Sequence, residues 1–244
     1  MNKLPVDHKR ISNEKEHGKW LAENNPEDEW GWGSPAGKLR AKRRADLIIK
    51  GGDLKLGKQI MEVGCGTGMF TEKFSKTGAN ILALDLAEDL LSIAKKRGLS
   101  NVEFRLSPFE EITIESSFDA IIGSSVLHHL DMDIALSAIY RLLKPGGKLC
   151  FAEPNMLNPQ VFIERHFRTF FKYVSQDETA FVRYHLKQQL QNSGFSKINI
   201  TPFDWLHPSV PPVLIDFVNS IGRLAEMTPF LREGSGSILI VAQK

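Results

Sequence analysis

Apolar runs and amphipathic stretches alternate along the chain from residue 58 onward. Short, nearly continuous apolar runs predict strands at residues 59–63, 79–85, 102–106, 118–126 and 148–153. Between them, apolar positions spaced three and four apart predict helices at 69–78, 87–98 and 133–147. Strands that alternate with helices in this way favour βαβ units, which right-handed crossovers lay into a parallel sheet covered on both faces.

After residue 153, strands and helices no longer alternate regularly. Residues 154–183 hold aromatic and basic side chains without a strand rhythm, and the tail then predicts a helix at 184–195, a strand at 196–203, an apolar helix at 211–227 and a last strand at 237–244. Residues 1–50 read as a separate helical lead-in. We therefore expect a lead-in or lid of residues 1–50 and a domain of residues 51–244, with insertions at about 154–183 and 204–232.

Composition narrows the class of protein. The 244 residues are 42% hydrophobic and 25% charged, which suits one globular unit with a full core. A net charge of +2 and a pI near 8.5 are too mild for a nucleic-acid partner. Cys65 and Cys150 are far apart and read as small buried residues, so neither a disulfide nor a metal site is expected. Without an apolar leader or an apolar stretch of ~18 residues, we expect a soluble, cytoplasmic protein.

The segment "IMEVGCGTGMF", residues 60–70, holds three glycines directly behind an apolar strand. A glycine-rich turn between strand and helix lets backbone amides meet a ligand. The dinucleotide fingerprint G-x-G-x-x-G fails at its third position, where Met69 stands, and the spacing is instead Glu62, Gly64, Gly66, Gly68. Asp85 closes the next strand, at the edge where a carboxylate can accept both hydroxyls of a ribose. Together these features indicate a nucleoside ligand.

Four motifs in order give the chain a resemblance to a family. "EVGCGTG", "LALDLAEDLL", "FDAIIGSSVLHHL" and "LLKPGGKLCFAEP" resemble the first motif, the acidic second strand, the fourth strand and the fifth strand of class I S-adenosylmethionine-dependent methyltransferases. The resemblance is close over residues 58–153. It implies an α/β, Rossmann-like fold with a seven-stranded sheet in the order 3-2-1-4-5-7-6, the last strand antiparallel. It also implies S-adenosyl-L-methionine as cofactor.

The resemblance also assigns cofactor-binding residues. Gly64, Gly66 and Gly68, with Cys65 between them, would face the methionine and ribose portions, and Glu62 would help to hold the amino end. Asp85 would bind the ribose hydroxyls and Leu86 would pack on the adenine. Three further positions complete the implied set: Ser107 and Phe109 at the adenine edge, and Ser124 at the methionine end through its carbonyl. Many relatives carry an Asp where "SPFEE" offers only a hydroxyl and backbone, which leaves the adenine contact in question.

Methyl transfer needs alignment and desolvation and does not require a dedicated catalytic residue. His128 and His129 follow the fourth strand and are the candidate catalytic bases, with His129 slightly favoured; packing beside the cofactor is the alternative.

Two further groups of residues lie outside the part of the chain that resembles the family. Trp20, Trp30 and Trp32, with residues 155–182, could form an aromatic lid or simply pack in the core. Arg40, Lys42, Arg43 and Arg44 could bind an acidic acceptor or form a solvated helix face.

The sequence excludes some classes of methyl acceptor but does not identify the acceptor itself. Residues 124–127 read "SSVL" rather than the [DN]-P-P-[YF] turn of enzymes that methylate exocyclic amines of nucleic acids, and Cys150 follows Leu149 rather than a proline. We predict transfer to a small-molecule acceptor at an O, N or C nucleophile. A protein or RNA methyltransferase, a non-catalytic cofactor-binding partner protein and a nucleotide oxidoreductase remain alternatives. The apolar helix 211–227 could serve a lipid-like acceptor or a homodimer.

Overall fold

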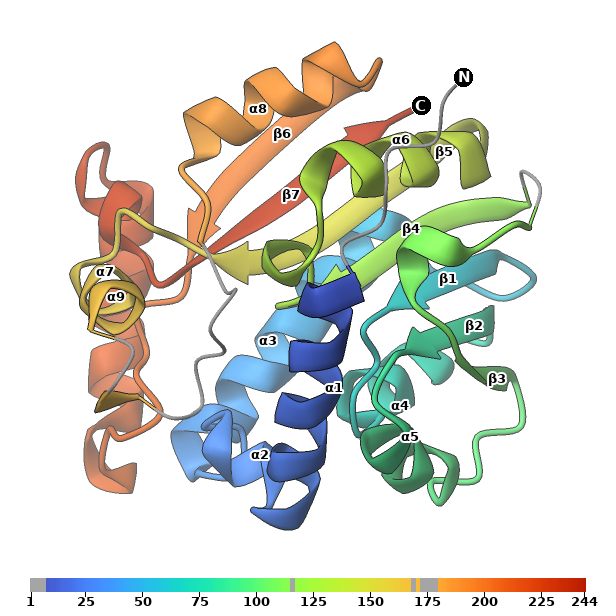
Figure 1. Cartoon of the computed structure of the whole chain (residues 1–244). Helices are drawn as coiled ribbons and strands as arrows, with labels where there is room; N and C mark the ends of the chain where they lie inside the picture. Colours follow the sequence, from blue (N-terminus) through green and yellow to red (C-terminus); the bar gives the residue numbers. More distant parts are fainter. Residues whose placement is uncertain (1–7, 115–116, 168–169, 172–179) are drawn as a thin grey trace.

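The computed structural model of the chain describes residues 8–114, 117–167, 170–171 and 180–244. Its seven-stranded sheet has the order β3-β2-β1-β4-β5-β7-β6, and β7 runs antiparallel to both β5 and β6 (Figure 1). The predicted strand order and the antiparallel last strand are therefore confirmed. The strands are β1 (Gln59–Val63), β2 (Asn80–Asp85), β3 (Val102–Leu106), β4 (Phe118–Ser124), β5 (Leu143–Pro154), β6 (Ser196–Phe203) and β7 (Ser237–Gln243).

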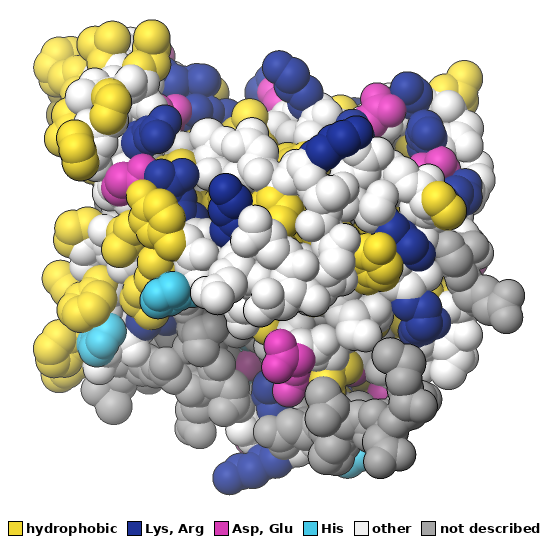
Figure 2. Space-filling view, turned by 90° about the horizontal axis from the view of Figure 1, so that it is seen from above, with side chains coloured by type: hydrophobic (Ala, Val, Ile, Leu, Met, Phe, Trp, Pro, Cys, Tyr) yellow, Lys and Arg dark blue, Asp and Glu magenta, His cyan; other side chains and the backbone are white. Residues whose placement is uncertain are grey.

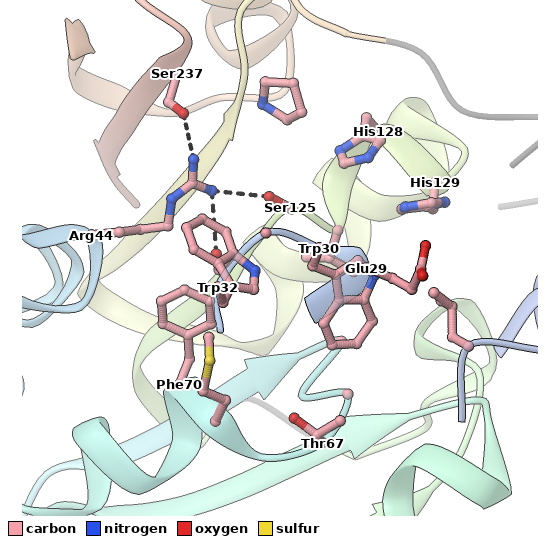
Figure 3. Close-up of a pocket in the computed structure, with 18 of the residues that line it drawn as sticks. Glu29, Trp30, Trp32, Arg44, Thr67, Phe70, Ser125, His128, His129 and Ser237 are labelled. Carbon is pink, nitrogen blue, oxygen red and sulfur yellow. Dashed lines mark hydrogen bonds between the residues drawn. The ribbon is translucent and has the colours of Figure 1, made fainter. Parts of the chain in front are cut away.

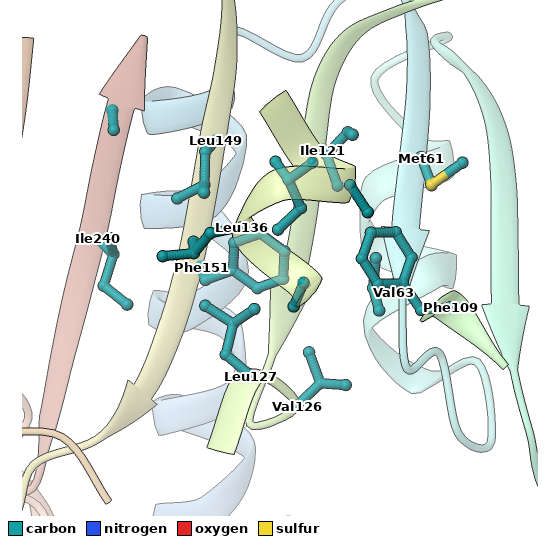
Figure 4. Packing of buried hydrophobic residues seen from close by; sticks show 14 of the residues in the cluster. Met61, Val63, Phe109, Ile121, Val126, Leu127, Leu136, Leu149, Phe151 and Ile240 are labelled. Carbon is teal, nitrogen blue, oxygen red and sulfur yellow. The ribbon is translucent and has the colours of Figure 1, made fainter. Parts of the chain in front are cut away.

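Helices cover both faces of this sheet because neighbouring strand residues point to opposite sides. Ile122 and Cys150 face a core shared with α3 (Pro35–Gly52), α4 (Met69–Ser75) and α5 (Glu88–Lys95). Ile121 and Leu149 face a second core shared with α6 (Met132–Leu142) and α8 (Arg183–Asn192), which Figure 4 shows from close by. Among the helices of the described residues, none is both long and apolar enough to cross a bilayer.

The helix expected at 133–147 ends earlier than its sequence pattern suggested. It stops at Leu142, and the chain continues as β5 from Leu143. Pro145 lacks an N–H and disfavours helical geometry in the residue before it, so the chain extends here. The ladder with β4 shifts register between the pairs Phe118–Leu143 and Ala120–Lys148. The strand expected at 118–126 likewise ends at Ser124, because Ser125 has a positive φ of 55° and turns the chain.

The amino-terminal segment forms α1 (His8–Glu23), α2 (Pro26–Glu29) and α3. Ser34 caps α3 by accepting a hydrogen bond from the Gly37 N–H at 3.0 Å. The expected boundary at residue 50 falls inside α3, whose Ala45 and Ile48 belong to the core, so α3 is one of the layers that cover the sheet. The division into domains otherwise stays a prediction.

The expected insertions hold α7 (Pro159–His166) and α9 (Ile215–Met227), with the short 3-10 turns η4 (Pro212–Leu214) and η5 (Leu231–Gly234). Part of the lid expected at 155–182, namely residues 168–169 and 172–179, lies outside the described residues. Two more 3-10 turns, η1 (Phe109–Glu111) and η2 (Leu127–His129), follow β3 and β4 at the carboxyl edge of the sheet.

Both cysteines are buried, as the sequence predicted, and both are free. Burial raises the pKa of the Cys150 thiol to about 12 and raises that of Cys65 well above its ordinary value. Both thiols are therefore protonated at neutral pH and behave as small apolar residues.

Candidate functional site

A cavity of about 710 Å³ opens at the carboxyl ends of β1, β2 and β4. Its floor is the glycine loop after β1, and its other walls come from the ends of β2 and β4 and from α1, α2, α3 and α7 (Figure 3). Ten of the twelve residues expected at the site line it: Gly64, Cys65, Gly66, Asp85, Leu86, Ser107, Phe109, Ser124, His128 and His129. Glu62 and Gly68 are absent from the lining.

The glycine loop needs glycine for two physical reasons. Gly64, Gly66 and Gly68 all have positive φ values, between 52° and 74°, which other residues rarely adopt. A side chain at Gly64 would also meet Val126 at 2.4 Å, and one at Gly66 would meet the Trp30 indole at 3.2 Å. Gly68 instead caps α4 and packs against Ala94. Only part of the glycine pattern thus faces the cavity, and the rest shapes the loop.

Asp85 holds the loop to the end of β2. One carboxylate oxygen accepts the Gly66 N–H at 2.7 Å and the other accepts the Ala87 N–H at 2.9 Å. Burial raises the pKa of Asp85 above its ordinary value, and these backbone hydrogen bonds oppose the rise. A carboxylate has about four lone-pair sites, so Asp85 can accept a hydrogen bond from a ligand beside those from the backbone.

Glu62 lies beneath the loop and is 1% exposed. Burial raises the pKa of its carboxyl to about 8, and the nearby charge of Asp85 adds to the rise while the Thr71 hydroxyl opposes it. Its Oε2 has no hydrogen-bond partner among the described residues. Glu62 is therefore a neutral acid at neutral pH, and a role for it toward a ligand stays a prediction.

The third-strand turn forms one end of the cavity. The Ser107 N–H donates to the Asp85 carbonyl at 3.0 Å, and the Ser107 hydroxyl donates to the Pro108 carbonyl at 3.1 Å. Phe109 is 3% exposed and anchors the turn in the core that contains α6. Leu86, half-buried, also lines this end. The contact of these side chains with an adenine stays a prediction.

Arg44 forms the opposite end of the cavity. Its Nη1 donates to the hydroxyl of Ser125 at 2.9 Å and to the Ala152 carbonyl at 3.2 Å, while Nη2 donates to Ser237 (Figure 3). Arg44 is 3% exposed, and no described carboxylate forms an ion pair with it. Burial lowers its pKa to about 10, so the guanidinium stays charged at neutral pH. A buried, unpaired cation on a cavity wall is a site for an anionic group.

The other three basic residues of the predicted cluster are already paired. Arg40 contacts Asp204 at 2.8 Å, Arg43 contacts Glu226 at 2.5 Å, and Lys42 contacts Asp46 on the exposed face of α3. The sequence left open whether this cluster binds an acidic acceptor or forms a solvated helix face. The structure separates its members, because only Arg44 presents a charge without a carboxylate partner to the cavity.

The two histidines after β4 have different carboxylate partners. His128 is 4% exposed, and its Nδ1 lies 2.6 Å from Oε2 of Glu153, whose Oε1 accepts the backbone N–H groups of Val126 and Leu127. Burial would raise the pKa of Glu153, but the hydrogen bond and charge of His128 and the backbone donors hold it below its ordinary value. His129 Nδ1 lies 3.0 Å from Oε2 of Glu14 on α1. Glu153 stands in a recognised strand, yet nothing in its spacing predicted this pairing.

Helices α1 and α2 cover the cavity. Arg10 on α1 contacts Glu110 and the His129 carbonyl, and Glu27 on α2 contacts both Thr67, at 3.0 Å, and Arg97, at 2.5 Å. Trp30 and Trp32 line the cavity, as expected of a lid, whereas Trp20 is not in the lining and stacks on His17. The lead-in thus closes over the glycine loop through polar contacts and two of its three tryptophans.

The raised pKa of Glu62 predicts a specific pH dependence of stability. The native carboxyl is protonated up to about pH 8, while the unfolded one ionises near ~4.3, so its contribution to the free energy of unfolding falls as pH rises between these values. Glu62→Gln should therefore lose less stability than the parent protein between about pH 5 and about pH 8. Urea unfolding of both proteins across this range measures the difference. Parallel pH profiles would show that Glu62 is not buried as an acid.

Comparisons with known proteins show which proteins this chain resembles. The family model described as "Methyltransferase domain" matches residues 61–151. A ubiquinone biosynthesis O-methyltransferase of Xanthomonas oryzae pv. oryzae is 36% identical over 118 residues, which cover 46% of this chain and 49% of that protein, so the chain spans about half the length of this curated relative. A putative methyltransferase of Haloferax volcanii, solved with the Trm112 methyltransferase activator, has a TM-score of 0.67 at 16% identity and covers 94% of this chain and 97% of its own.

A second similar structure is phosphoethanolamine N-methyltransferase 2 of Haemonchus contortus, solved with phosphomonomethylethanolamine and S-adenosylhomocysteine. Its TM-score is 0.60 at 17% identity, with 82% of this chain and 52% of that chain covered. At such identities the solved structures show a shared fold only. The family match covers most of β1 to β5 and includes the glycine loop that forms the floor of the cavity. Residues 61–151 therefore belong to a methyltransferase domain, and the strand order is that of class I S-adenosylmethionine-dependent methyltransferases, whose cofactor is S-adenosylmethionine.

Proposed function

We propose that this protein transfers a methyl group from S-adenosylmethionine to a hydroxyl of a small-molecule acceptor and releases S-adenosylhomocysteine. The observation that carries the proposal is a single covered cavity that joins the glycine loop to a buried imidazole–carboxylate pair, His128 and Glu153. The name of the curated relative, an O-methyltransferase, favours oxygen as the acceptor atom. The covering by α1 and α2 favours an acceptor small enough to be enclosed.

The charges at the two ends of the cavity fit the cofactor. Asp85 has lone pairs for the ribose hydroxyls, and Arg44 offers a buried positive charge to the methionine carboxylate. Gly66 and Trp30 bound the space between these ends. When bound, S-adenosylmethionine supplies a methyl group activated by its positively charged sulfur. The protein's part is to align the acceptor with that methyl, exclude water and hold a proton acceptor.

The ribose assignment is tested at Asp85. Asp85→Ala removes the acceptor of the ribose hydroxyls and the clamp on Gly66, and should weaken S-adenosylhomocysteine binding at least about tenfold, or ~1.4 kcal/mol. Titration calorimetry measures the affinity. Asp89→Ala, four residues along on the exposed side of α5, is the matched control and should bind as the parent does. Equal affinity of the two variants would remove Asp85 from the site.

The carboxylate assignment is tested at Arg44 with two ligands. Arg44→Met should weaken S-adenosylhomocysteine by about tenfold or more, because a charge-assisted pair is lost. It should leave 5′-methylthioadenosine, which has the same nucleoside but no carboxylate, within about threefold of its affinity for the parent protein. Calorimetry with both ligands measures the two changes. Equal losses for both ligands would mean that Arg44 only supports the fold of the cavity.

The proton acceptor is proposed to be His128. A neutral ring that donates its Nδ1–H to Glu153 keeps its other nitrogen as the basic one, which can take the proton of an acceptor hydroxyl. Glu153 is a positioning residue that fixes this tautomer and stabilises the charged ring. The sequence slightly favoured His129; its partner Glu14 belongs to the covering helix α1, whereas Glu153 belongs to the sheet. We therefore expect His128 to be the better oriented of the two.

Turnover tests the function and the base together. S-adenosylhomocysteine formation is followed with a panel of phenols, catechols and hydroxybenzoates, and active acceptors are then tested with His128→Gln and His129→Gln. His128→Gln should lower kcat by about 10²-fold and flatten the acid limb of the pH–rate profile, with KM for S-adenosylmethionine nearly unchanged. His129→Gln should have a smaller effect. Full activity of His128→Gln would remove the base, and cofactor binding without turnover of any acceptor would favour the non-catalytic partner protein.

A further inference from the structure

Helix α7 exposes its largest apolar side chains and buries a carboxyl group. Phe162 and Ile163 are each 48% exposed, and Figure 2 shows hydrophobic side chains gathered at the edge of the molecule where Figure 1 places α7 and α9. Of the residues of α7, all of them described, only Glu164 is buried, with 9% exposed. A surface helix ordinarily buries its apolar stripe and leaves its charged residues in water. Hydrophobic packing therefore does not explain why Glu164 is buried.

Glu164 lines the cavity and has a neutral hydrogen-bond partner. Gln160, four residues earlier on α7, donates from its Nε2 to Oε1 of Glu164 at 2.7 Å, and Oε2 has no partner among the described residues. Arg165, the next residue along, also lines the cavity but is not paired with Glu164. An amide donor orients a carboxylate without compensating its charge. A molecule in the cavity can therefore complete the contacts of this group.

Among the described residues, three buried acids line the cavity: Glu14, Glu164 and Asp204. Two of them face a basic side chain. Glu14 Oε2 lies 3.0 Å from Nδ1 of His129, and Asp204 Oδ2 lies 2.8 Å from Nε of Arg40. Glu164 forms no ion pair with any residue that the structure describes. Because a buried charge without a counter-charge is costly, a cation is the group that best completes this position.

The neighbouring His207 does not supply the missing positive charge. Its Nε2 lies 2.8 Å from Nε2 of Gln160, and its Nδ1 accepts the N–H of Ser209 at 3.1 Å. A protonated imidazole has no acceptor, so these contacts suit a neutral ring. Partial burial and the charge of Arg40 hold the pKa of His207 below its ordinary value, although nearby carboxylates oppose this. At neutral pH the ring therefore leaves the charge of Glu164 uncompensated.

The place of α7 in the chain indicates which molecule Glu164 would meet. The family match ends at residue 151, and α7 begins at Pro159. Asp85 and Arg44, which the proposed function assigns to the cofactor, lie on β2 and α3. Glu164 is therefore available to the other molecule that the reaction requires, which is the methyl acceptor.

We propose that Glu164 binds a positively charged amino group of the methyl acceptor, so that the acceptor is a small molecule with both a hydroxyl and a protonated amine. The inference deepens the proposed function and rests on it, since it takes this cavity to hold the acceptor. Glu164 is a specificity-determining residue. It selects the acceptor by charge and fixes one end of the molecule.

Binding to the cofactor-loaded protein tests the charge preference without requiring turnover. Calorimetry on the full chain saturated with S-adenosylhomocysteine compares three phenols of similar size: tyramine, which carries an ammonium group, 4-ethylphenol, which is neutral, and 4-hydroxyphenylacetate, which carries a carboxylate. Tyramine should bind at least about tenfold more tightly than 4-ethylphenol, and 4-hydroxyphenylacetate more weakly than both. A protein that binds tyramine no better than 4-ethylphenol, or that binds none of the three, overturns the proposal.

Glu164→Gln tests whether this one side chain produces the preference. The variant keeps an oxygen for Gln160 and removes the charge, so the affinity for tyramine should fall about tenfold while that for 4-ethylphenol stays within about threefold. Glu16→Gln, on the exposed side of α1 and outside the cavity lining, is the matched control and should bind all three phenols as the parent does. Equal losses for tyramine and 4-ethylphenol would mean that Glu164 only shapes the wall, and the proposal would fall.

The failure of this inference differs from the failure of the proposed function. If hydroxylated acceptors are methylated but the protein shows no preference for the amine, the function stands and the role of Glu164 is wrong. If the preference for the amine depends on Glu164 while no acceptor is methylated, the cation site is supported and the proposed transfer is wrong.

Discussion

The carboxylate of Asp85 is the contact on which the shape of the site depends. It joins the end of β2 to the glycine loop after β1 by accepting the N–H groups of Gly66 and Ala87, at 2.7 and 2.9 Å. A buried carboxylate is costly unless such donors surround it, and a loop of three glycines is loose unless something holds it. The backbone N–H groups thus stabilise the buried carboxylate, and the carboxylate in turn holds the loop in place. The hydrogen bond from the Gly66 N–H to Asp85 thus holds this glycine in its left-handed conformation, with a φ of 52°.

At the opposite end of the cavity, hydrogen bonds hold a buried positive charge. The Arg44 guanidinium is held by neutral oxygens of Ser125, Ala152 and Ser237 rather than by a carboxylate. Neutral acceptors orient the group without cancelling its charge, so the positive potential remains directed into the cavity. A carboxylate at one end and a guanidinium at the other give the cavity a direction. A ligand with hydroxyls at one end and an anion at the other is favoured in one orientation only.

The sequence predicted features that neighbouring residues encode, and it did not predict contacts between residues that are far apart in the chain. Strands with apolar runs, the glycine spacing and the position of Asp85 are local patterns, and the family resemblance that they carry implied the strand order and ten residues that line the cavity. Arg44 meets Ser237 across 193 residues, and Arg10 meets the His129 carbonyl across 119. No periodicity encodes such contacts. Glu153 was placed on its strand, but its pairing with His128 requires β4 and β5 to be adjacent and in register. Helix 211–227 was recognised as apolar, while its exposure depends on which side meets Trp205.

The acceptor must be sought outside the part of the chain that relatives share. The family match ends at residue 151, and the curated relative covers about half of the chain. Yet much of the cavity wall beyond the glycine loop comes from α2, α3, α7 and the segment after β6, including Trp32, Arg40, Gln160 and Trp205. Two proteins that share β1 to β5 therefore share the cofactor end and can differ wholly at the other. A relative's name bears on the methyl donor and the acceptor atom, whereas we expect these four side chains to select the acceptor molecule.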